Sequence, residues 1–399
     1  MAVDREVHGV LGVASYSTVH SAGTDNADSW QAMVTGRTGL QENRLSWCDL
    51  PCWVGEVGGV DAVVLPDELI EWDCRTHRLA WMALQRNGFL RATADAVARH
   101  GADRVGLVLG SSTSGMRDTE QAYARLRDTG AWPDGFAYRR SHSLDAMCRF
   151  SAEALGLRGP MVAISTACSS STKVFLTAQR WIDCGLIDAA VVGGVDSLCL
   201  STLHGFHSLQ LLSDEPCRPF DEARKGISIG EAAGFVLLDK APAAISFLGG
   251  GESSDAWHMS TPHPDGLGAQ DAMRGALRMA ALEAGDIGYV NAHGTATLAN
   301  DRAEAAAVNA VFGAGAVPLS SSKGVTGHTL GAAGITEAIV VIQALEHGTL
   351  PPTAGLRKVD ADLGVDLLEQ PRRARVRHAM SNNFGFGGSN CSLVFGRTA

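Results

Sequence analysis

The chain has 399 residues, of which 45% are hydrophobic and only 19% charged, so it can bury a large core and does not resemble a disordered chain. Its net charge of −10 argues against nucleic acid as the main partner, because phosphate binding requires a basic surface. Its 46 glycines fall partly into short strings, which are typical of tight turns and close backbone contacts.

Strands and helices alternate through the first 240 residues. The segment Met1–Val10 includes Asp4, Arg5 and Glu6 and has no apolar stretch, so it is not expected to be a signal peptide. Short apolar runs alternate with segments of helical periodicity. The expected strands are Val7–Ala14, Arg104–Gly110, Pro160–Thr166, Ala189–Val195 and Ala233–Leu238, and the expected helices are Arg78–His100, interrupted near Gly88, and Ser169–Cys184, stopped by Gly185.

The same alternation continues to the end of the chain and predicts a layered α/β architecture. No run of about 18 apolar residues occurs, so no membrane-spanning helix is expected. The expected strands are Ile245–Leu248, Tyr289–Ala292, Val317–Ser321 and Cys391–Phe395, and the expected helices are Asn300–Phe312 and Gly334–His347.

The two halves show a weak internal similarity. In each, a strand leads through a short loop with a reactive residue into a helix: Ile164–Cys168–Val174 and Val290–His293–Ala303. A duplicated unit and a chance similarity explain this about equally well, because any α/β protein contains strand–loop–helix units. The segment Ala241–Ala244, which contains Pro242, is the best candidate joint. We therefore expect halves at residues 1–240 and 241–399 that share a core.

Cys168 is the first candidate reactive group. It lies where a buried strand ends and a helix begins, in Thr166-Ala167-Cys168-Ser169-Ser170, and the small neighbours leave room for a substrate. A helix N-terminus lowers the pKa of a thiol and favours the nucleophilic thiolate. The other eight cysteines are scattered, and the closest pair, Cys48 and Cys52, lacks the Cys-x-x-Cys spacing of zinc and redox motifs. A lone buried cysteine is usually only a small apolar residue, and a reducing cytosol is expected.

Two histidine loops follow apolar segments. One is Asn291-Ala292-His293-Gly294-Thr295-Ala296-Thr297, and the other runs from Ser322-Lys323 to Gly327-His328. Each histidine alone could be a hydrogen-bonded structural residue. Together with Cys168 they form a candidate site, and no His-Glu-x-x-His spacing points to a metal. A fourth segment, Asn382–Asn390, places glycines around Phe386, where backbone N–H groups could stabilise an oxyanion; the alternative is an ordinary glycine-rich turn.

These motifs jointly resemble the β-ketoacyl-acyl carrier protein synthases of the elongating type, synthases I and II. The resemblance extends from about the first strand to the C-terminus, because weaker matches lie between the main motifs. Those weaker matches are Arg218-Pro219-Phe220-Asp221, Ser253-Ser254-Asp255-Ala256-Trp257-His258 and Asn300-Asp301-x-x-Glu304.

The resemblance implies a thiolase fold: two similar α/β halves in five layers (αβαβα), usually as a dimer. It implies decarboxylative condensation of an acyl chain on Cys168 with malonyl-acyl carrier protein, using no cofactor and no metal. His293 and His328 would donate N–H bonds to the developing negative oxygen, and Lys323 would keep the potential positive and orient its own loop, paired with Glu337. The backbone N–H groups of Cys168 and Phe386 would form a second oxyanion hole, with Phe386 also a gate. The remaining implied site residues are the substrate contacts Thr295, Thr297, Phe384, Gly387 and Ser111, and the structural network of Asp301 and Glu304.

The chain also departs from the common family pattern. Ser169–Lys173 is more polar than usual, Ser111–Gly115 replaces a Gly/Ile-rich loop near the acyl pocket, and Lys225 stands where an acidic residue is common; Lys240–Ile245 is shorter. These changes leave open whether the pathway is fatty acid synthesis or a specialised polyketide, polyene or pigment pathway. A basic patch for the carrier protein could be drawn from Arg37, Arg44, Arg75, Arg78, Arg139 and Arg140.

Three related classes of protein agree less well with the sequence. A degradative thiolase would need a second, C-terminal cysteine, but Cys391 is expected to start a strand. An initiating synthase would use one histidine and an asparagine, whereas this chain has two histidines. A catalytically inactive chain-length subunit would lack the cysteine. The chain can still be the active half of a heterodimer with a homologous chain-length partner, and the alternative is a homodimer.

Overall fold

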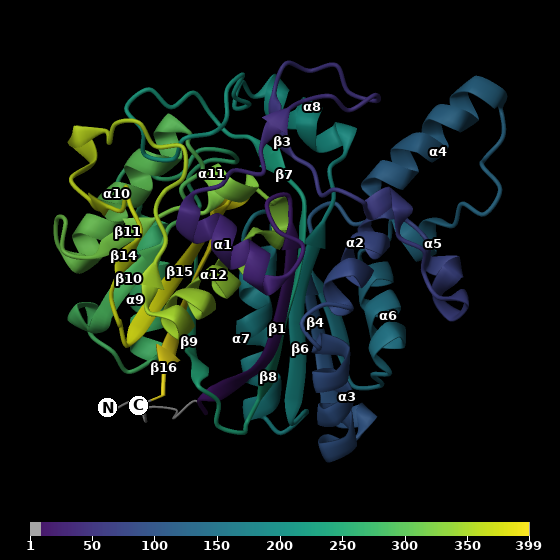
Figure 1. Ribbon diagram of the computed structural model, residues 1–399, viewed down its shortest axis with the longest axis horizontal. Helices are drawn as coiled ribbons and strands as arrows, with labels where there is room; N and C mark the ends of the chain where they lie inside the picture. Colours follow the sequence, from purple (N-terminus) through teal and green to yellow (C-terminus); the bar gives the residue numbers. More distant parts are fainter. Residues whose placement is uncertain (1–8, 399) are drawn as a thin grey trace.

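Two half-sheets and three layers of helices make up the molecule (Figure 1). The computed structural model describes residues 9–398, so residues 7 and 8 of the first expected strand lie outside the described residues. Within the described range, no helix is long and apolar enough to cross a membrane. The five-layer thiolase fold expected from the resemblance is confirmed.

The N-terminal half-sheet has the strand order β1-β8-β6-β4-β5. Helices α2, α3 and α6 cover its outer face, in blue and teal at the right of Figure 1. The elements of this half are β1 (Leu11–His20), α1 (Asn26–Thr35), α2 (Arg75–Leu84), α3 (Phe89–His100), β4 (Val105–Gly110), α4 (Met116–Thr129), α5 (Tyr138–Ser141), α6 (Leu144–Leu155), β5 (Met161–Ile164), α7 (Ser170–Asp183), β6 (Ala189–Asp196), α8 (Leu200–Ser208) and β8 (Ala232–Asp239). A small separate sheet joins β2 (Gln41–Glu42), β3 (Trp53–Gly55) and β7 (Ile229–Gly230).

The C-terminal half-sheet has the order β13-β11-β10-β15-β16-β9, covered on its outer face by α9 and α10. Its elements are β9 (Ile245–Ser254), α9 (Leu267–Met279), β10 (Ile287–Asn291), α10 (Leu298–Phe312), β11 (Pro318–Ser320), α11 (Lys323–Thr326), α12 (Ala333–His347), β13 (Asp366–Leu367), β15 (His378–Gly385) and β16 (Ser389–Arg397). A separate two-stranded antiparallel sheet joins β12 (Thr349–Leu350) and β14 (Arg372–Arg373).

The sheet topology establishes the duplication. Strands β5-β4-β6-β8-β1 and β11-β10-β15-β16-β9 have the same order and the same parallel and antiparallel pairings. The two halves meet where β1 pairs with β9 through only two residue pairs. In this correspondence β5 matches β11 and β4 matches β10. The internal similarity proposed from the sequence therefore matched the wrong strands: the counterpart of the Cys168 loop is the Lys323 loop, not the His293 loop.

Helices α7 and α12 form the middle layer, between the two half-sheets. Helix α12 is buried along residues 333–345, which explains why its sequence is apolar on all sides. At Gly334 an added Cβ would lie 2.1 Å from Thr172 Oγ1, so the starts of α7 and α12 are in direct contact. This contact brings together the loop that follows β5 in the first half and the loop that follows β11 in the second half.

The glycine string Gly249–Gly251 lies within β9, beneath α9. An added Cβ at Gly251 would lie 2.1 Å from the carbonyl oxygen of Ala272, so only glycine allows the helix to approach this closely. The predicted close backbone contact is confirmed.

Most strands and long helices lie where the sequence predicted them, to within a few residues, including the break between α2 and α3 near Gly88. No expected element corresponds to α1, α4, α5, α6, α8, α9, α11 or β15, or to the short strands β2, β3, β7, β12, β13 and β14. Strand β15 runs through Asn382–Gly385, so much of the segment interpreted as a flexible glycine loop is paired sheet.

Candidate active site

Cys168 lies in the turn between β5 and α7. Ala167 has a left-handed backbone conformation (φ 51°), which an L-residue adopts only at a cost, and the turn is closed by hydrogen bonds from Ser169 and Ser170 N–H to Thr166 and Ala167 oxygens. Helix α7 begins at Ser170, two residues later. The turn therefore directs the Cys168 sulfur away from the sheet and toward the facing loops of the C-terminal half.

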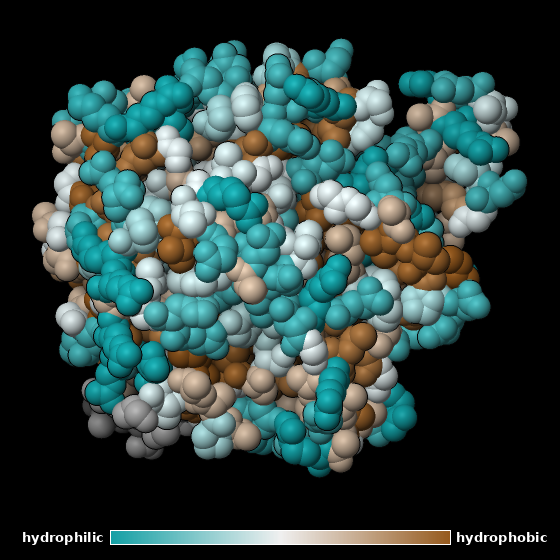
Figure 2. Space-filling model, in the orientation of Figure 1, coloured by the Kyte–Doolittle hydropathy of each residue, from teal (hydrophilic) through white to brown (hydrophobic). Residues whose placement is uncertain are grey.

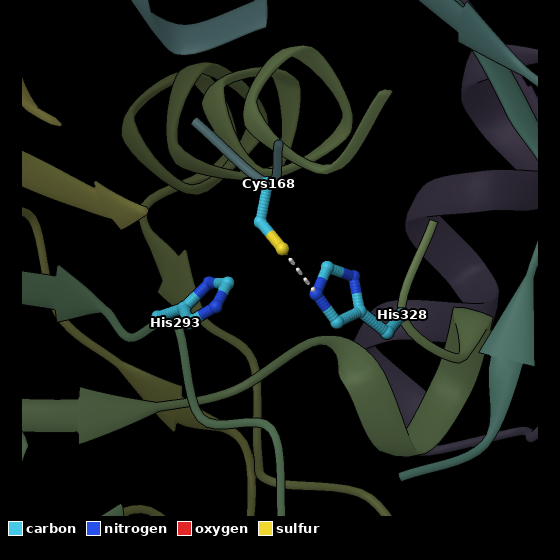
Figure 3. A group of neighbouring side chains, drawn as sticks. All are labelled: Cys168, His293 and His328. Atoms are coloured by element: carbon cyan, nitrogen blue, oxygen red, sulfur yellow. Dashed lines mark hydrogen bonds between the residues drawn. The ribbon is translucent and has the colours of Figure 1, made fainter. Parts of the chain in front are cut away.

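His328 makes the direct contact with the nucleophile. Its Nε2 lies 3.0 Å from Cys168 Sγ, and its Nδ1 accepts a hydrogen bond from Leu330 N–H at 3.1 Å. Because Nδ1 is an acceptor, the proton of the neutral ring is on Nε2. The ring thus presents an N–H donor to the sulfur (Figure 3).

His293 completes the group from the opposite side. Lys323 Nζ lies 3.3 Å from His293 Nδ1 and also donates to the His293 carbonyl oxygen. An ammonium group has only donors, so Nδ1 must accept and Nε2 carries the proton. The two rings lie edge to face with centroids 5.3 Å apart, and both face Cys168 in Figure 3. Two Nε2–H donors are therefore directed at the space beside the sulfur.

Lys323 is fully buried and pairs with the buried Glu337, whose second oxygen accepts from Asn383 Nδ2 at 2.7 Å. The Lys323–Glu337 pairing expected from the resemblance is present. Lys323 orients the His293 loop, however, and not only its own loop. Asn383 in turn accepts from Thr172 Oγ1 at 2.8 Å, which ties this network to α7.

Glu304 and Asp301 hold the His293 loop from α10. Glu304 accepts from the backbone N–H groups of His293 at 2.8 Å and Gly294 at 2.7 Å. Asp301 accepts from Phe220 N–H and Ala296 N–H, and its carboxylate lies 3.3 Å from Arg224. Burial raises the pKa of Glu304 to about 7, against the two N–H bonds that lower it. Both carboxylates act on backbone position and neither lines the cavity.

Both histidines are neutral in this environment. Burial lowers the pKa of His293 and of His328 well below the usual value, and the positive charge of Lys323 lowers both further. A neutral imidazole with Nε2–H can donate to a negative oxygen without itself giving up a proton. This is the state that the resemblance implies.

Cys168 is a resting thiol, which differs from the thiolate expected at a helix N-terminus. Burial raises its pKa to about 11, although Lys323 and the backbone N–H groups of Phe386 and Cys168 act in the opposite direction. Desolvation of a charge outweighs these favourable contacts because the sulfur is enclosed.

We predict that alkylation of Cys168 by iodoacetamide accelerates about tenfold per pH unit from pH 7 to 10, because only the thiolate reacts. Peptide mass spectrometry resolved by residue measures the rate, and alkylation of the other cysteines is followed in the same digest. A rate that reaches its plateau near pH 7 would show that the thiol is already ionised, contrary to this burial argument.

A cavity of about 170 Å³ opens at these side chains. Phe386 lies on its wall and packs against Phe206, with ring centroids 5.4 Å apart. Gly387 and Gly388 take left-handed conformations beside it (φ 80° and 76°), which glycine adopts without strain. The predicted site residues that line the cavity are Cys168, His293, His328, Thr295, Thr297, Phe384, Phe386 and Gly387.

The cavity also contains residues that the sequence analysis did not select. Its apolar part is formed by Phe206, Leu209, Leu211 and Ile227, and its polar part includes His258 and Asn300. Asp255 and His258 lie in one of the weaker family matches, which was a usable signal. Phe206 lies in α8, Leu209 and Leu211 follow it directly, and Ile227 lies just before β7; no periodic apolar pattern predicted α8.

Ser111 and Arg75 lie inside the protein. Ser111 is buried, donates to Asp196 at 2.6 Å and is not among the cavity residues, so its substrate contact stays a prediction. Arg75 is buried and pairs with the buried Glu231 and with Asp61 at the surface, so it cannot belong to a basic surface patch. Arg37, Arg78 and Arg140 pair with Asp28, Asp73 and Glu71, and Lys225 lies at the surface beside Glu215.

The polar run after Cys168 has a structural explanation. Ser170 Oγ accepts from Thr166 N–H at 2.9 Å, and Ser171 Oγ accepts from Ile335 N–H at 2.9 Å at the start of α12. Thr172 binds Asn383, as described above. The Ser170 and Ser171 hydroxyls thus accept from backbone N–H groups and the Thr172 hydroxyl binds a buried side chain, so the polar run carries no information about the polarity of the acyl substrate.

The atoms of Cys168, His293 and His328 lie within 4.8 Å of one another and could in principle hold a metal ion. Both rings would then need a free Nε2 lone pair, with the proton moved to Nδ1. That position is occupied by the Leu330 N–H group in one ring and by the Lys323 ammonium in the other. A cation would also face Lys323 directly, so these residues do not fit a metal site.

Comparison with known proteins agrees with this geometry. Residues 74–244 match the beta-ketoacyl synthase N-terminal domain, and residues 246–357 match its C-terminal domain. Nodulation protein E of Rhizobium meliloti (strain 1021) is 35% identical over 392 residues, which cover 94% of this chain and 95% of that protein. The 3-oxoacyl-[acyl-carrier-protein] synthase 2 of Vibrio cholerae is 37% identical over 321 residues, covering 75% and 78% of the two chains. The ketosynthase ApeO of Xenorhabdus doucetiae, solved in complex with its chain length factor ApeC, has a TM-score of 0.90 and 38% identity over 100% of both chains.

Proposed function

This chain belongs to the β-ketoacyl synthase family, and we propose that it is the catalytic subunit of a pair formed with a homologous chain-length partner. As a β-ketoacyl-acyl carrier protein synthase it is an acyltransferase that forms carbon–carbon bonds in fatty acid or polyketide biosynthesis. The observation that carries the assignment is the convergence of the Cys168 sulfur and two imidazole Nε2–H groups in one cavity.

In the first half-reaction, the Cys168 sulfur attacks the thioester carbonyl of an acyl carrier protein. The carbonyl oxygen becomes negative and lies against the N–H groups of Cys168 and Phe386. The carbon–sulfur bond to the carrier then breaks, and the carrier thiol leaves with the proton that the cysteine gave up. Because the resting group is a thiol, its proton must leave as the acyl group arrives.

In the second half-reaction, malonyl-acyl carrier protein enters and its carboxylate carbon–carbon bond breaks to release carbon dioxide. The enolate oxygen accepts hydrogen bonds from Nε2–H of His293 and of His328. The carbanion attacks the acyl carbonyl on Cys168, and the new carbon–carbon bond forms as the sulfur departs. One proton from solvent restores the thiol, and β-ketoacyl-acyl carrier protein is released.

The two halves of the chain divide this work. In the division proposed at residues 240 and 241, the first half supplies Cys168. The second half supplies His293, His328 and the Phe386 gate. Thr295 and Thr297 stand at the cavity wall with hydroxyls 3.0 Å apart, a suitable pair for the polar arm of a carrier thioester.

The edge strand β5 favours association with a second chain. It ends the sheet, and its residues Met161 and Val162 are 47% and 36% exposed. Exposed apolar edge strands are strong candidates for pairing with another sheet. Because β5 leads directly into the Cys168 turn, a partner bound there would lie close to the acyl site.

Helices α4 and α5 and the loop between them, residues 116–141, form an arm that projects from the body (Figure 1). Tyr123, Trp132 and Tyr138 on this arm are exposed. Near its base, apolar surface gathers beside α5, where Ile70 and Leu144 are exposed (Figure 2). These surfaces support a dimer, and the solved ketosynthase ApeO, which is in complex with its chain length factor, favours a heterodimer over a homodimer.

The cytosol is the compartment that suits this chemistry. All nine cysteines are free thiols, and Cys168 must remain reduced to accept an acyl group.

The test is reconstitution with a homologous chain that lacks the nucleophilic cysteine, taken from the same genome. We expect the two chains to co-elute at one-to-one stoichiometry, and the pair to condense acyl carriers with malonyl carrier. Intact-mass spectrometry with a panel of acyl carriers identifies which acyl groups are loaded onto Cys168. A homodimer with full condensing activity and no affinity for the second chain would refute the heterodimer. Failure of every acyl carrier to load the protein would refute the enzyme assignment.

A further inference from the structure

Asp196 is a buried carboxylate that has no role in the reaction described above and lies outside the family motifs. It is the last residue of β6, is fully buried, and lies between the Ser111–Thr113 loop and the loop after His328. Its partners are hydroxyls and backbone N–H groups. They are Ser111 Oγ (2.6 Å), Ser112 N and Oγ (3.0 and 2.7 Å), Thr113 N and Oγ1 (2.9 and 2.8 Å) and Gly331 N (2.6 Å).

The contact between Asp196 and Gly331 affects Leu330, the residue before Gly331, whose N–H group binds His328. Leu330 has a left-handed backbone conformation (φ 55°), which a leucine adopts only when its surroundings hold it. In that conformation Leu330 N–H reaches His328 Nδ1 at 3.1 Å. Anchoring the Gly331 N–H group on Asp196, with Ser112 Oγ as a second acceptor at 3.2 Å, fixes the turn immediately after this strained residue.

We propose that Asp196 is a positioning residue for His328: by anchoring Gly331 it holds Leu330 N–H on His328 Nδ1 and so keeps the proton on Nε2, toward Cys168. The proposal deepens the proposed function and rests on it. It also gives the Ser111-Ser112-Thr113 loop a role, since its three hydroxyls satisfy the carboxylate that binds Gly331. His293 does not depend on Asp196, because Lys323 fixes its tautomer independently.

Asp196→Asn tests the proposal with little change in size. Each carboxylate oxygen accepts from at least one backbone N–H group, so the amide must turn its NH₂ toward one of them. The Oδ1 position has four donors and the Oδ2 position has three, so the amide oxygen should remain at Oδ1. The NH₂ group then faces Gly331 N–H and displaces it. Ser112→Ala removes the hydroxyl that donates to Asp196 Oδ2 and accepts from Gly331 N–H. It should also release Gly331, but to a smaller extent than Asp196→Asn.

The matched control is Asp239→Asn. Asp239 is equally buried, but lies at the opposite end of the β6–β8 ladder, where it binds Arg99 and His100. Decarboxylation of malonyl carrier should fall about tenfold or more in Asp196→Asn, because a donor to the enolate is lost from part of the population. It should be nearly unchanged in Asp239→Asn.

Nitrogen NMR of the protein labelled with ¹⁵N-histidine separates this effect from general loosening. In the wild type, Nδ1 of both His293 and His328 should resonate as unprotonated nitrogen. In Asp196→Asn, only the Nδ1 and Nε2 resonances of His328 should shift toward the values of the other tautomer. Unchanged His328 resonances, or activity equal to that of Asp239→Asn, would overturn the proposal. A wild type that does not decarboxylate malonyl carrier at all would instead refute the proposed function.

Discussion

Replacing Cys168 by serine is expected to abolish acyl loading, with the mass shift from acyl carriers forming at least about a hundredfold more slowly than in the wild type. The turn of Ala167 and the contact with His328 Nε2–H would be retained, so the geometry changes little. The loss arises because a serine hydroxyl has a far higher pKa and is a weaker nucleophile than a thiol, and no general base adjoins it here. His328 presents a proton, not a lone pair, to this position.

The matched control for this experiment is Cys391→Ala. Cys391 is the cysteine that a degradative thiolase would need, yet it lies within β16, fully buried, and burial raises its pKa strongly. We expect normal acyl loading in this variant. Loading that persists at the full level in Cys168→Ser, or disappears in Cys391→Ala, would contradict the assignment of the nucleophile.

Replacing His293 by alanine is expected to leave acyl loading of Cys168 intact and to slow decarboxylation of malonyl carrier by about a hundred- to a thousandfold. Loss of one preorganised donor to a developing negative oxygen costs about 3–4 kcal/mol. Loading should survive because His328, not His293, contacts the sulfur, and because the proposed oxyanion hole of the first step consists of the backbone N–H groups of Cys168 and Phe386. Carbon dioxide release from malonyl carrier and intact mass measure the two steps separately.

A second buried histidine provides the comparison. His77 stacks on Phe150 at 4.6 Å and contacts the Trp72 carbonyl, outside the cavity. His77→Ala should lower stability while leaving the ratio of decarboxylation to loading unchanged. Unaltered carbon dioxide release in His293→Ala would mean that His328 alone stabilises the enolate.

Several parts of the fold were predictable because they depend on local patterns. Buried strands such as β4 and β6 are continuous apolar runs, and α12 is apolar on every side because it lies between two half-sheets. Helix α4 was missed because it projects from the body and buries only Thr119 and Ala122, so its sequence is mostly polar and has no apolar run to mark a core helix. Strand β15 was missed because Ser381, Asn382 and Asn383 are typical loop residues, whereas here they are buried and paired in the sheet.

The reactive groups of this protein could be recognised from the sequence alone: a cysteine before a helix, two histidine loops, a lysine and a glycine-flanked phenylalanine. These are local motifs, so their residue types and spacing can be recognised without coordinates. The protonation state of each group could not be predicted in this way, because it depends on neighbours that are distant in sequence and that the fold brings into contact. Burial keeps Cys168 as a thiol where the helix terminus alone suggested a thiolate. Lys323 and Leu330 N–H place the proton of each imidazole on Nε2, and Asp196, 135 residues from Gly331, anchors the turn that makes this possible.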